Sequence, residues 1–403
     1  MLTLFGATSL PVQAQHGFVF PEKEQYTDLP FEYINHFILV RLRLNHTLPV
    51  TFLFDTGAES TVLTRRELSD FLNIQYSRRL RMQGSDLSDT LVAYLARNIR
   101  LDAGETLGAD QQDVLVLEED YFRFDTYAGV PVYGILSANT MSDYLVEIDY
   151  TRLRIRLHRP GRYDPARHGY TAVPMTVERN KPYVQARISV VPDSTVTVKL
   201  LLDTGAALPL LLFYNTHPLL APPVQTVPSR IAMGIGGYLE GYTGRIARLD
   251  LGSFQQQEVI SYFQQIDTTL WREHLNDRNG LVGNLVFRRF RVIFDYQGNT
   301  LWLKPSRTYD DPYRFDRSGL FLVSAGEGEN GQLVQFVVPG SPGAEAGILR
   351  GDVLLRAGNR RATSQNLTAV NRVFQQKPGK RVRLLLRRDG VELKKEIVLR
   401  DLL

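Results

Sequence analysis

Two aspartates stand in the same short motif at two places in the chain. Phe52-Leu-Phe-Asp55-Thr-Gly-Ala58 recurs as Leu200-Leu-Leu-Asp203-Thr-Gly-Ala206. Two carboxylic acids that folding brings together can share one proton, so that the ionised one serves as a base and the protonated one as an acid. Such a pair can activate a water molecule and protonate a departing amine, which is what amide hydrolysis requires. We therefore expect Asp55 and Asp203 to form a general acid–base pair.

The chain around these motifs is duplicated. A single Asp-Thr-Gly is weak evidence, because Asp and Gly are ordinary turn residues. Other landmarks, however, follow each motif in the same order and at closely matched intervals. They are Arg100-Leu-Asp102-Ala-Gly104 and Arg248-Leu-Asp250-Leu-Gly252, Gly134-Ile-Leu and Gly280-Leu-Val, and Asp149-Tyr150 and Asp295-Tyr296. This agreement indicates an internal repeat, with units at about 30–160 and 175–306.

Both units have the pattern of β structure. Residues 37–44 and 184–190 alternate apolar and polar side chains, as half-buried strands do. Residues 160–174 are rich in Pro, Gly and charge, which suits a linker between the units. With one aspartate in each unit, the two units must face each other, and a monomer can supply both.

Composition narrows the class of protein. The 403 residues are 43% hydrophobic and 22% charged, which is typical of a folded protein. Lys and Arg number 47 against 43 Asp and Glu, so the small excess of positive charge does not indicate a nucleic-acid partner. There is no Cys, and the seven His show no metal-binding spacing. No interior apolar run approaches the ~20 residues of a membrane span.

The N-terminal residues have part of the pattern of a secretory signal. Residues 1–15 hold a short apolar stretch, and Val12-Gln-Ala14 fits a cleavage site, although no basic residue precedes the stretch. We expect an exported protein, periplasmic or secreted; a cytoplasmic protein is the expectation if these residues are not a signal.

The duplicated motif resembles the active-site signature of aspartic proteases of the retropepsin-like branch, in which Ala follows Asp-Thr-Gly. Gly280-Leu-Val-Gly283-Asn284 resembles a later signature of that branch, where a glycine packs behind the active-site loop. The resemblance covers most of 30–306. It implies two acid-protease β lobes that form an intrachain pseudo-dimer, with Asp55 and Asp203 as catalytic residues. The sequence departs from the pattern at Ser137, which stands where the second unit has Gly283.

Supporting residues follow from the same motifs. Gly57 and Gly205 permit a tight turn whose amides reach the carboxylates, and the resemblance implies that Thr56 and Thr204 hydrogen-bond across the pseudo-twofold axis. A covering hairpin is expected about 30 residues beyond each aspartate, where an ordinary hairpin turn would explain the pattern equally well. The candidates for this flap are Gly84, Gly236, Gly237 and Tyr238.

After a second linker at about 310–318 the pattern changes. The run Gly340-Ser-Pro, Ala346-Gly and Gly351-Asp-Val resembles the PDZ domain of bacterial exported proteases, over about 316–403. A PDZ domain adds a peptide as an extra strand and holds its terminal carboxylate with backbone N–H groups. The candidates for the carboxylate loop are Gly319, Leu320, Phe321 and Leu322. The candidates for the other wall of the peptide groove are Leu367, Val370 and Phe374, whose spacing fits core packing equally well.

These patterns predict a mostly β protein with a signal peptide at 1–15, lobes at 16–165 and 166–308, and a small α+β PDZ domain at 316–403. We expect an aspartic endopeptidase that acts on a peptide or protein, needs no cofactor or metal ion, and offers its PDZ domain to a C-terminal peptide. Two alternatives remain open: a catalytically silent peptide-binding or envelope scaffold with the same fold, and a regulatory or assembly factor that acts through PDZ contacts.

Overall fold

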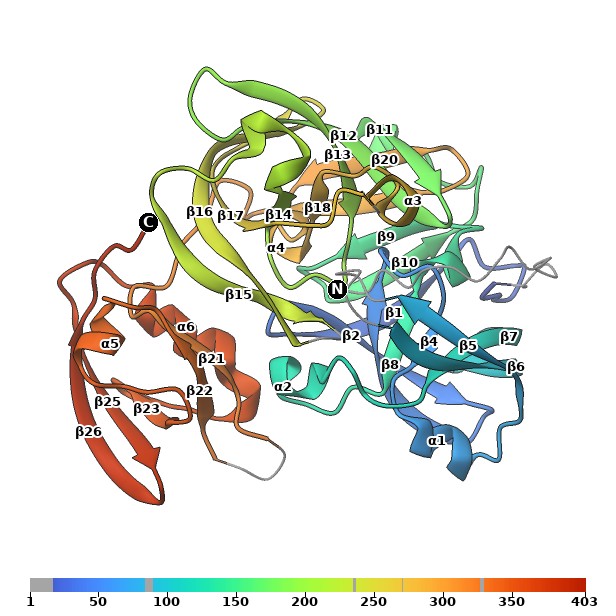
Figure 1. The fold of residues 1–403 in the computed structure, drawn as a ribbon. Helices are drawn as coiled ribbons and strands as arrows, with labels where there is room; N and C mark the ends of the chain where they lie inside the picture. Colours follow the sequence, from blue (N-terminus) through green and yellow to red (C-terminus); the bar gives the residue numbers. More distant parts are fainter. Residues whose placement is uncertain (1–16, 84–89, 235–236, 270, 327–329) are drawn as a thin grey trace.

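Strands dominate the computed structural model, which describes residues 17–83, 90–234, 237–269, 271–326 and 330–403 (Figure 1). Two β lobes are followed by a smaller α+β module, so the predicted fold class is confirmed. No helix of the described residues is long and apolar enough to cross a membrane.

The first lobe comprises β1 to β10. Its elements are β1 (Tyr26–Ile34), β2 (Phe37–Leu44), β3 (Leu48–Asp55), β4 (Val62–Leu63), α1 (Arg66–Phe71), β5 (Tyr76–Gln83), β6 (Thr90–Ala103), β7 (Leu107–Leu117), α2 (Phe124–Ala128), β8 (Gly134–Ser137), β9 (Leu145–Asp149) and β10 (Arg154–His158).

The second lobe comprises β11 to β20. Its elements are β11 (Thr171–Glu178), β12 (Lys181–Ser189), β13 (Thr195–Leu202), β14 (Leu210–Phe213), β15 (Thr226–Gly234), β16 (Gly237–Leu251), β17 (Phe254–Gln264), α3 (Trp271–Leu275), β18 (Gly280–Val282), α4 (Asn284–Phe287), β19 (Phe290–Asp295) and β20 (Thr300–Pro305).

The C-terminal module has a sheet in the order β21-β22-β23-β25-β26. Its elements are β21 (Leu320–Ser324), β22 (Gln332–Val337), α5 (Pro342–Glu345), β23 (Val353–Ala357), β24 (Arg360–Arg361), α6 (Leu367–Phe374), β25 (Arg381–Arg388) and β26 (Val391–Val398). Short 3₁₀ turns cover Ala138–Met141, Ala166–His168, Tyr214–Thr216, Pro218–Leu220 and Ser364–Asn366.

The two lobes repeat one topology. In the first lobe β3 runs parallel to β8, and β4 lies between β8 and β7. In the second lobe β13 runs parallel to β18, and β14 lies between β18 and β17. The register pairs Phe52 with Gly134 and Leu200 with Gly280, so the landmarks of the sequence repeat occupy equivalent places. Each aspartate therefore comes at or just after the end of a strand that neighbours flank on both sides.

A shared sheet joins the lobes. β9 of the first lobe pairs antiparallel with β19 of the second, which places β1, β10 and β9 beside β19, β20 and β11 in one continuous sheet. The largest apolar cluster contains residues from both lobes, such as Phe54 and Leu202. Backbone pairing and apolar burial therefore fix the position of one lobe against the other.

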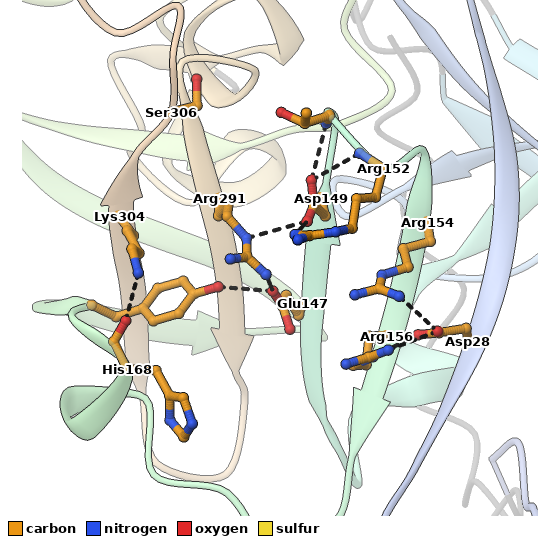
Figure 2. A network of polar contacts seen from close by, with 12 residues as sticks. Asp28, Glu147, Asp149, Arg152, Arg154, Arg156, His168, Arg291, Lys304 and Ser306 are labelled. Atoms are coloured by element: carbon orange, nitrogen blue, oxygen red, sulfur yellow. Dashed lines mark hydrogen bonds and ion pairs between the residues drawn. The ribbon is translucent and has the colours of Figure 1, made fainter.

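Buried charges also tie the lobes together. Arg291 of β19 lies 2.7 Å from Glu147 and 3.2 Å from Asp149, both on β9 (Figure 2). Burial alone would raise the pKa of Glu147, but hydrogen bonds from His158 and Tyr170 and the Arg291 charge lower it to about 2. The carboxylate therefore stays ionised inside the interface, where it needs its cation.

We expect Arg291→Met to lower the free energy of unfolding by ~3 kcal/mol, because it removes the cation that the buried Glu147 and Asp149 share and leaves Asp149 with Arg152 alone. The Glu147 carboxyl has a lower pKa in the folded chain than its usual 4.5. Its stabilising contribution is therefore full above that value and is lost as the pH falls toward about 2. Urea unfolding at several pH values measures both effects.

Arg167→Met is the matched control, because Arg167 forms an exposed ion pair with Asp164. Such pairs contribute about 0–1 kcal/mol. Equal losses for the two variants would contradict the role assigned to the interface ion pairs.

Candidate active site

The two Asp-Thr-Gly turns meet between the lobes. Asp55 ends β3 and Asp203 follows β13 directly, and both carboxyl groups are buried, at 2% and 1% exposure. Because the lobes share one topology, equivalent strand ends face each other across the interface. The structure therefore brings together the two aspartates that the sequence predicts as a pair.

Crossed hydrogen bonds lock the turns to each other. The Thr56 hydroxyl donates to the Leu202 carbonyl at 2.7 Å and accepts the Thr204 amide at 3.0 Å. The Thr204 hydroxyl donates to the Phe54 carbonyl at 3.1 Å and accepts the Thr56 amide at 3.0 Å. All four bonds are buried and all cross from one lobe to the other. The threonines lie where the resemblance places them.

The two glycines lie against the carboxylates of both turns. The Gly57 amide donates to Asp55 Oδ1 at 2.6 Å, and the Gly205 amide donates to Asp203 Oδ1 at 2.8 Å. A Cβ at Gly57 would lie 2.8 Å from Cγ of Asp203, and one at Gly205 would lie 2.4 Å from Oδ2 of Asp55. Each glycine thus leaves room for the carboxylate of the opposite lobe.

The carboxyl groups form an electrostatic pair. Burial raises the pKa of Asp55 well above its ordinary value, and the Asp203 charge raises it further. Burial also raises the pKa of Asp203, while the charge of Arg278 and a hydrogen bond with Asp55 oppose that rise. Two such acids titrate as a unit, and one proton held between them removes the repulsion of two negative charges.

Three charged residues near the pair were not singled out from the sequence. Lys181, which is fully buried, opens β12 of the second lobe, and its Nζ lies 3.3 Å from Oε2 of Glu59 in the first lobe. Arg278 is 1% exposed and interacts electrostatically with both aspartates. The position of Glu59, directly after Asp-Thr-Gly-Ala, was the one available signal in the sequence.

In the other half of the duplication, apolar residues occupy the positions equivalent to these three charged residues. By strand register, Lys181 corresponds to Phe37 and Arg278 to Val132, and both of these belong to an apolar cluster that Ala207 contacts. Ala207 in turn corresponds to Glu59. The site is therefore pseudo-symmetric in its backbone but charged on one side only.

Each aspartate turn has its own support. In the first lobe the Ser137 hydroxyl donates to the Ala58 carbonyl at 2.7 Å, so the departure from glycine adds a hydrogen bond behind the turn. In the second lobe a Cβ at Gly283 would lie 2.3 Å from the Leu208 carbonyl oxygen, so glycine is required there. The Asn284 side chain donates to the carbonyls of Thr204 and, at 3.0 Å, His36, which links the turn to the first lobe.

Two pairs of antiparallel strands lie next to the expected flap positions in the sequence. β5 pairs with β6 and β15 pairs with β16, with Gly234 opposite Gly237. Gly84 and Gly236 lie outside the described residues. Gly237 and Tyr238 begin β16, and nothing is described of their side chains. The flap role of these residues stays a prediction.

The residues expected in the PDZ groove lie on β21, on α6 and in the turn before β21. Leu320, Leu322, Leu367, Val370 and Phe374 are buried in the core of the module, Gly319 is buried in the turn, and Phe321 is half-buried. The described residues contain no cluster of His, Asp and Glu that could hold a metal ion.

A comparison with known protein families identifies the C-terminal module. Residues 334–388 match the family profile described as PDZ domain. The C-terminal module is a PDZ domain. The two β lobes, each with its Asp-Thr-Gly turn, have the arrangement that the resemblance to aspartic proteases implies. A search of curated proteins finds no match.

Two basic 7S globulins are among the solved structures that resemble the chain. Basic 7S globulin from soybean has 11% identity and a TM-score of 0.44, over 72% of this chain and 99% of that chain. Conglutin gamma from lupine seeds, also a basic 7S globulin, has 12% identity and a TM-score of 0.42, over 71% of this chain and 96% of that chain.

We expect Thr56→Val and Thr204→Val each to lower the free energy of unfolding by about 2–3 kcal/mol, because each leaves a buried carbonyl and a buried amide without a partner. The same substitution at Thr47, whose hydroxyl bonds the Leu44 carbonyl in an exposed turn, is the matched control. Urea unfolding compares the three variants. A loss at Thr56 no larger than at Thr47 would show that the crossed bonds do not hold the turns.

Proposed function

We propose that this protein is an aspartic endopeptidase in which Asp55 and Asp203 activate one water molecule. The observation that carries this proposal is the pair of buried carboxyl groups set against each other by glycine turns and crossed threonine bonds. A duplicated scaffold needs no such arrangement for stability, because two buried acids repel each other unless they share a proton.

The proposed mechanism assigns one role to the ionised acid of the pair and another to the protonated acid. The Arg278 charge opposes the rise in the pKa of Asp203, and the Lys181 charge favours the ionised form of Asp55, so the shared proton belongs to the pair. The ionised acid is the base that removes a proton from the attacking water, while the protonated acid donates its proton to the carbonyl oxygen of the peptide bond. When the C–N bond breaks, the departing amine takes the proton that the base gained from water. A hydroxyl of the tetrahedral intermediate returns its proton to the other acid as the carboxyl product forms, so the pair is again singly protonated.

The surroundings suit this chemistry. Amides of Gly57 and Gly205 hold one oxygen of each carboxyl group, so both groups are oriented before a substrate arrives. Burial makes the electrostatic interaction between the two acids stronger than it would be in water. A protein that only binds peptides would have no need of this orientation, and the orientation favours the enzyme over the silent scaffold.

We expect Asp55→Asn and Asp203→Asn each to reduce peptide cleavage by about a thousandfold or more, because a neutral amide can neither share the proton nor act as the base. Cleavage of a mixed peptide library, followed across pH with and without pepstatin, measures this. Both variants should unfold cooperatively, like the unaltered chain.

Asp193→Asn is the control, since Asp193 is exposed in a loop with positive φ, a conformation that Asn also adopts. Full activity in either single variant at the pair would refute a shared dyad. An unaltered chain that cleaves no peptide at any pH would favour the peptide-binding scaffold.

The charged residues on one side of the aspartate pair predict that removing the Lys181 charge shifts the pH dependence of peptide cleavage. Lys181 interacts electrostatically with Asp55, and its positive charge favours the ionised acid. Removing that charge raises the pKa values of the pair, so both limbs of the activity profile should move to higher pH, by roughly 0.5–1 unit in Lys181→Met. Burial lowers the pKa of Lys181 itself to about 8, so the difference from the unaltered chain should vanish above that pH.

Two further variants separate charge from structure. Lys181→Arg keeps the charge and should keep the profile. Lys199→Met removes a lysine that pairs with Glu178 and Asp277, so it should alter stability without moving the profile. An unmoved profile in Lys181→Met would contradict the electrostatic role while leaving the dyad itself untouched.

A further inference from the structure

The strand of the PDZ domain that would receive a peptide has one unpaired edge. β21 pairs with β22 on one side, and no other described strand pairs with it. In a PDZ domain the peptide adds to such an edge, and the turn before the strand holds the terminal carboxylate with its amides. The turn here is Asp316–Leu320. Its amides are therefore the ones that a C-terminal peptide would need.

A carboxylate of the chain itself already occupies these amides. Oδ1 of Asp316 accepts the Ser318 amide at 2.8 Å and the Gly319 amide at 2.7 Å. The Leu320 amide donates to the Ser318 hydroxyl oxygen at 3.1 Å, and that hydroxyl donates to Asp316 at 2.8 Å. Successive backbone N–H groups of this kind form an anion-binding nest. The nest holds the side chain of Asp316 in place of a peptide terminus.

The other end of the peptide site lies against the first lobe. The Arg317 amide donates to the Phe374 carbonyl at 3.0 Å, so the nest sits by the C-terminal end of α6. At the opposite end of α6, the amide and hydroxyl of Thr368 donate to Oδ1 of Asn35 at 3.2 and 3.1 Å. Asn35 Nδ2 donates in turn to the carbonyls of Tyr127 and Ala128 in α2.

The first lobe packs closely against the PDZ domain beside Asn35. A Cβ at Gly129 would lie 1.9 Å from the Ser364 carbonyl oxygen, next to α6. α2 lies beside β21 (Figure 1), and all of β21 is buried except the half-buried Phe321. The residues of a peptide that extends upstream from the nest would meet α2.

The second lobe holds the same domain from another side. The Arg230 guanidinium of β15 lies 5.6 Å from the centre of the Phe336 ring on β22. The PDZ domain is thus attached to the first lobe through Asn35 and to a hairpin of the second lobe through Arg230.

We propose that the PDZ domain is held in a self-occupied state, in which Asp316 takes the place of a peptide carboxylate and α2 closes the upstream end of the peptide site. A peptide with a free C-terminal carboxylate binds only by displacing Asp316 from the nest and the first lobe from β21. This inference does not depend on the proposed protease activity.

The full-length chain tests the first half of the proposal. The probe is a set of fluorescent heptapeptides ending in Val, Leu or Phe, each with a free carboxylate and again as the C-terminal amide. Burial raises the pKa of Asp316 to about 6, so this residue is ionised at neutral pH, where the titration is run. Asp316→Ala should bind at least one free-carboxylate peptide about tenfold or more tightly than the unaltered chain does.

The amidated peptides should gain no affinity from Asp316→Ala, because the emptied nest selects a carboxylate. Asp316→Asn, which removes the charge but keeps the shape, checks that the result is not a folding defect; it should gain affinity in the same direction. Asp389→Asn, in an exposed hairpin turn of the same domain, should gain none. Equal peptide affinity in the unaltered chain and in both Asp316 variants, tight or absent, would overturn the proposal.

Hydrogen exchange tests the second half. Adding the best free-carboxylate peptide to Asp316→Ala should speed amide exchange in α2 by about tenfold or more, since the peptide displaces that helix from β21. Exchange in β10, remote from the contact, should not change. A bound peptide that leaves α2 as protected as before would overturn the upstream closure.

Discussion

The centre of this protein depends on one electrostatic constraint: two carboxyl groups that cannot both be ionised are held in the same buried space. In each turn a glycine amide donates a hydrogen bond to the carboxylate of that turn. A Cβ at either glycine would clash with the carboxylate of the opposite turn. Four hydrogen bonds between Thr56, Thr204 and the neighbouring carbonyls keep the turns from separating. The shared sheet and the Arg291 ion pairs hold the lobes that support these turns.

The two halves of the duplication have kept their backbone and diverged in their charges. Lys181, Glu59 and Arg278 gather on one side of the pair, whereas Phe37, Ala207 and Val132 occupy the equivalent places on the other. A symmetric pair would have no reason to place its shared proton on either acid. The one-sided charge makes the surroundings of the two acids unequal, because Lys181 and Arg278 have no charged counterparts in the other half.

The same kind of interaction recurs at the far end of the chain. In the lobes a carboxylate accepts backbone amides at the end of a strand; in the PDZ domain Asp316 does so at the start of β21. In the lobes the arrangement prepares an acid for proton transfer. In the PDZ domain it fills an anion site, and the contacts of Asn35 and Arg230 make the domain part of the two-lobe body.

The sequence alone determined the duplication, the β character of both units, the pairing of Asp55 with Asp203 and the C-terminal PDZ domain. The order of the residues was sufficient for these points. The repeated motif, the strand period of two residues and the run that resembles a PDZ domain can each be recognised in a contiguous part of the sequence. The buried charges near the pair were out of reach. Lys181 and Glu59 are far apart in sequence and belong to different lobes, and only Glu59 adjoins a motif. The spacing of Leu367, Val370 and Phe374 fits a groove wall and a core equally, and only the packing around α6 shows that they lie in the core. Only the tertiary structure decided these points, since it alone determines which side chains that are distant in sequence are buried next to one another.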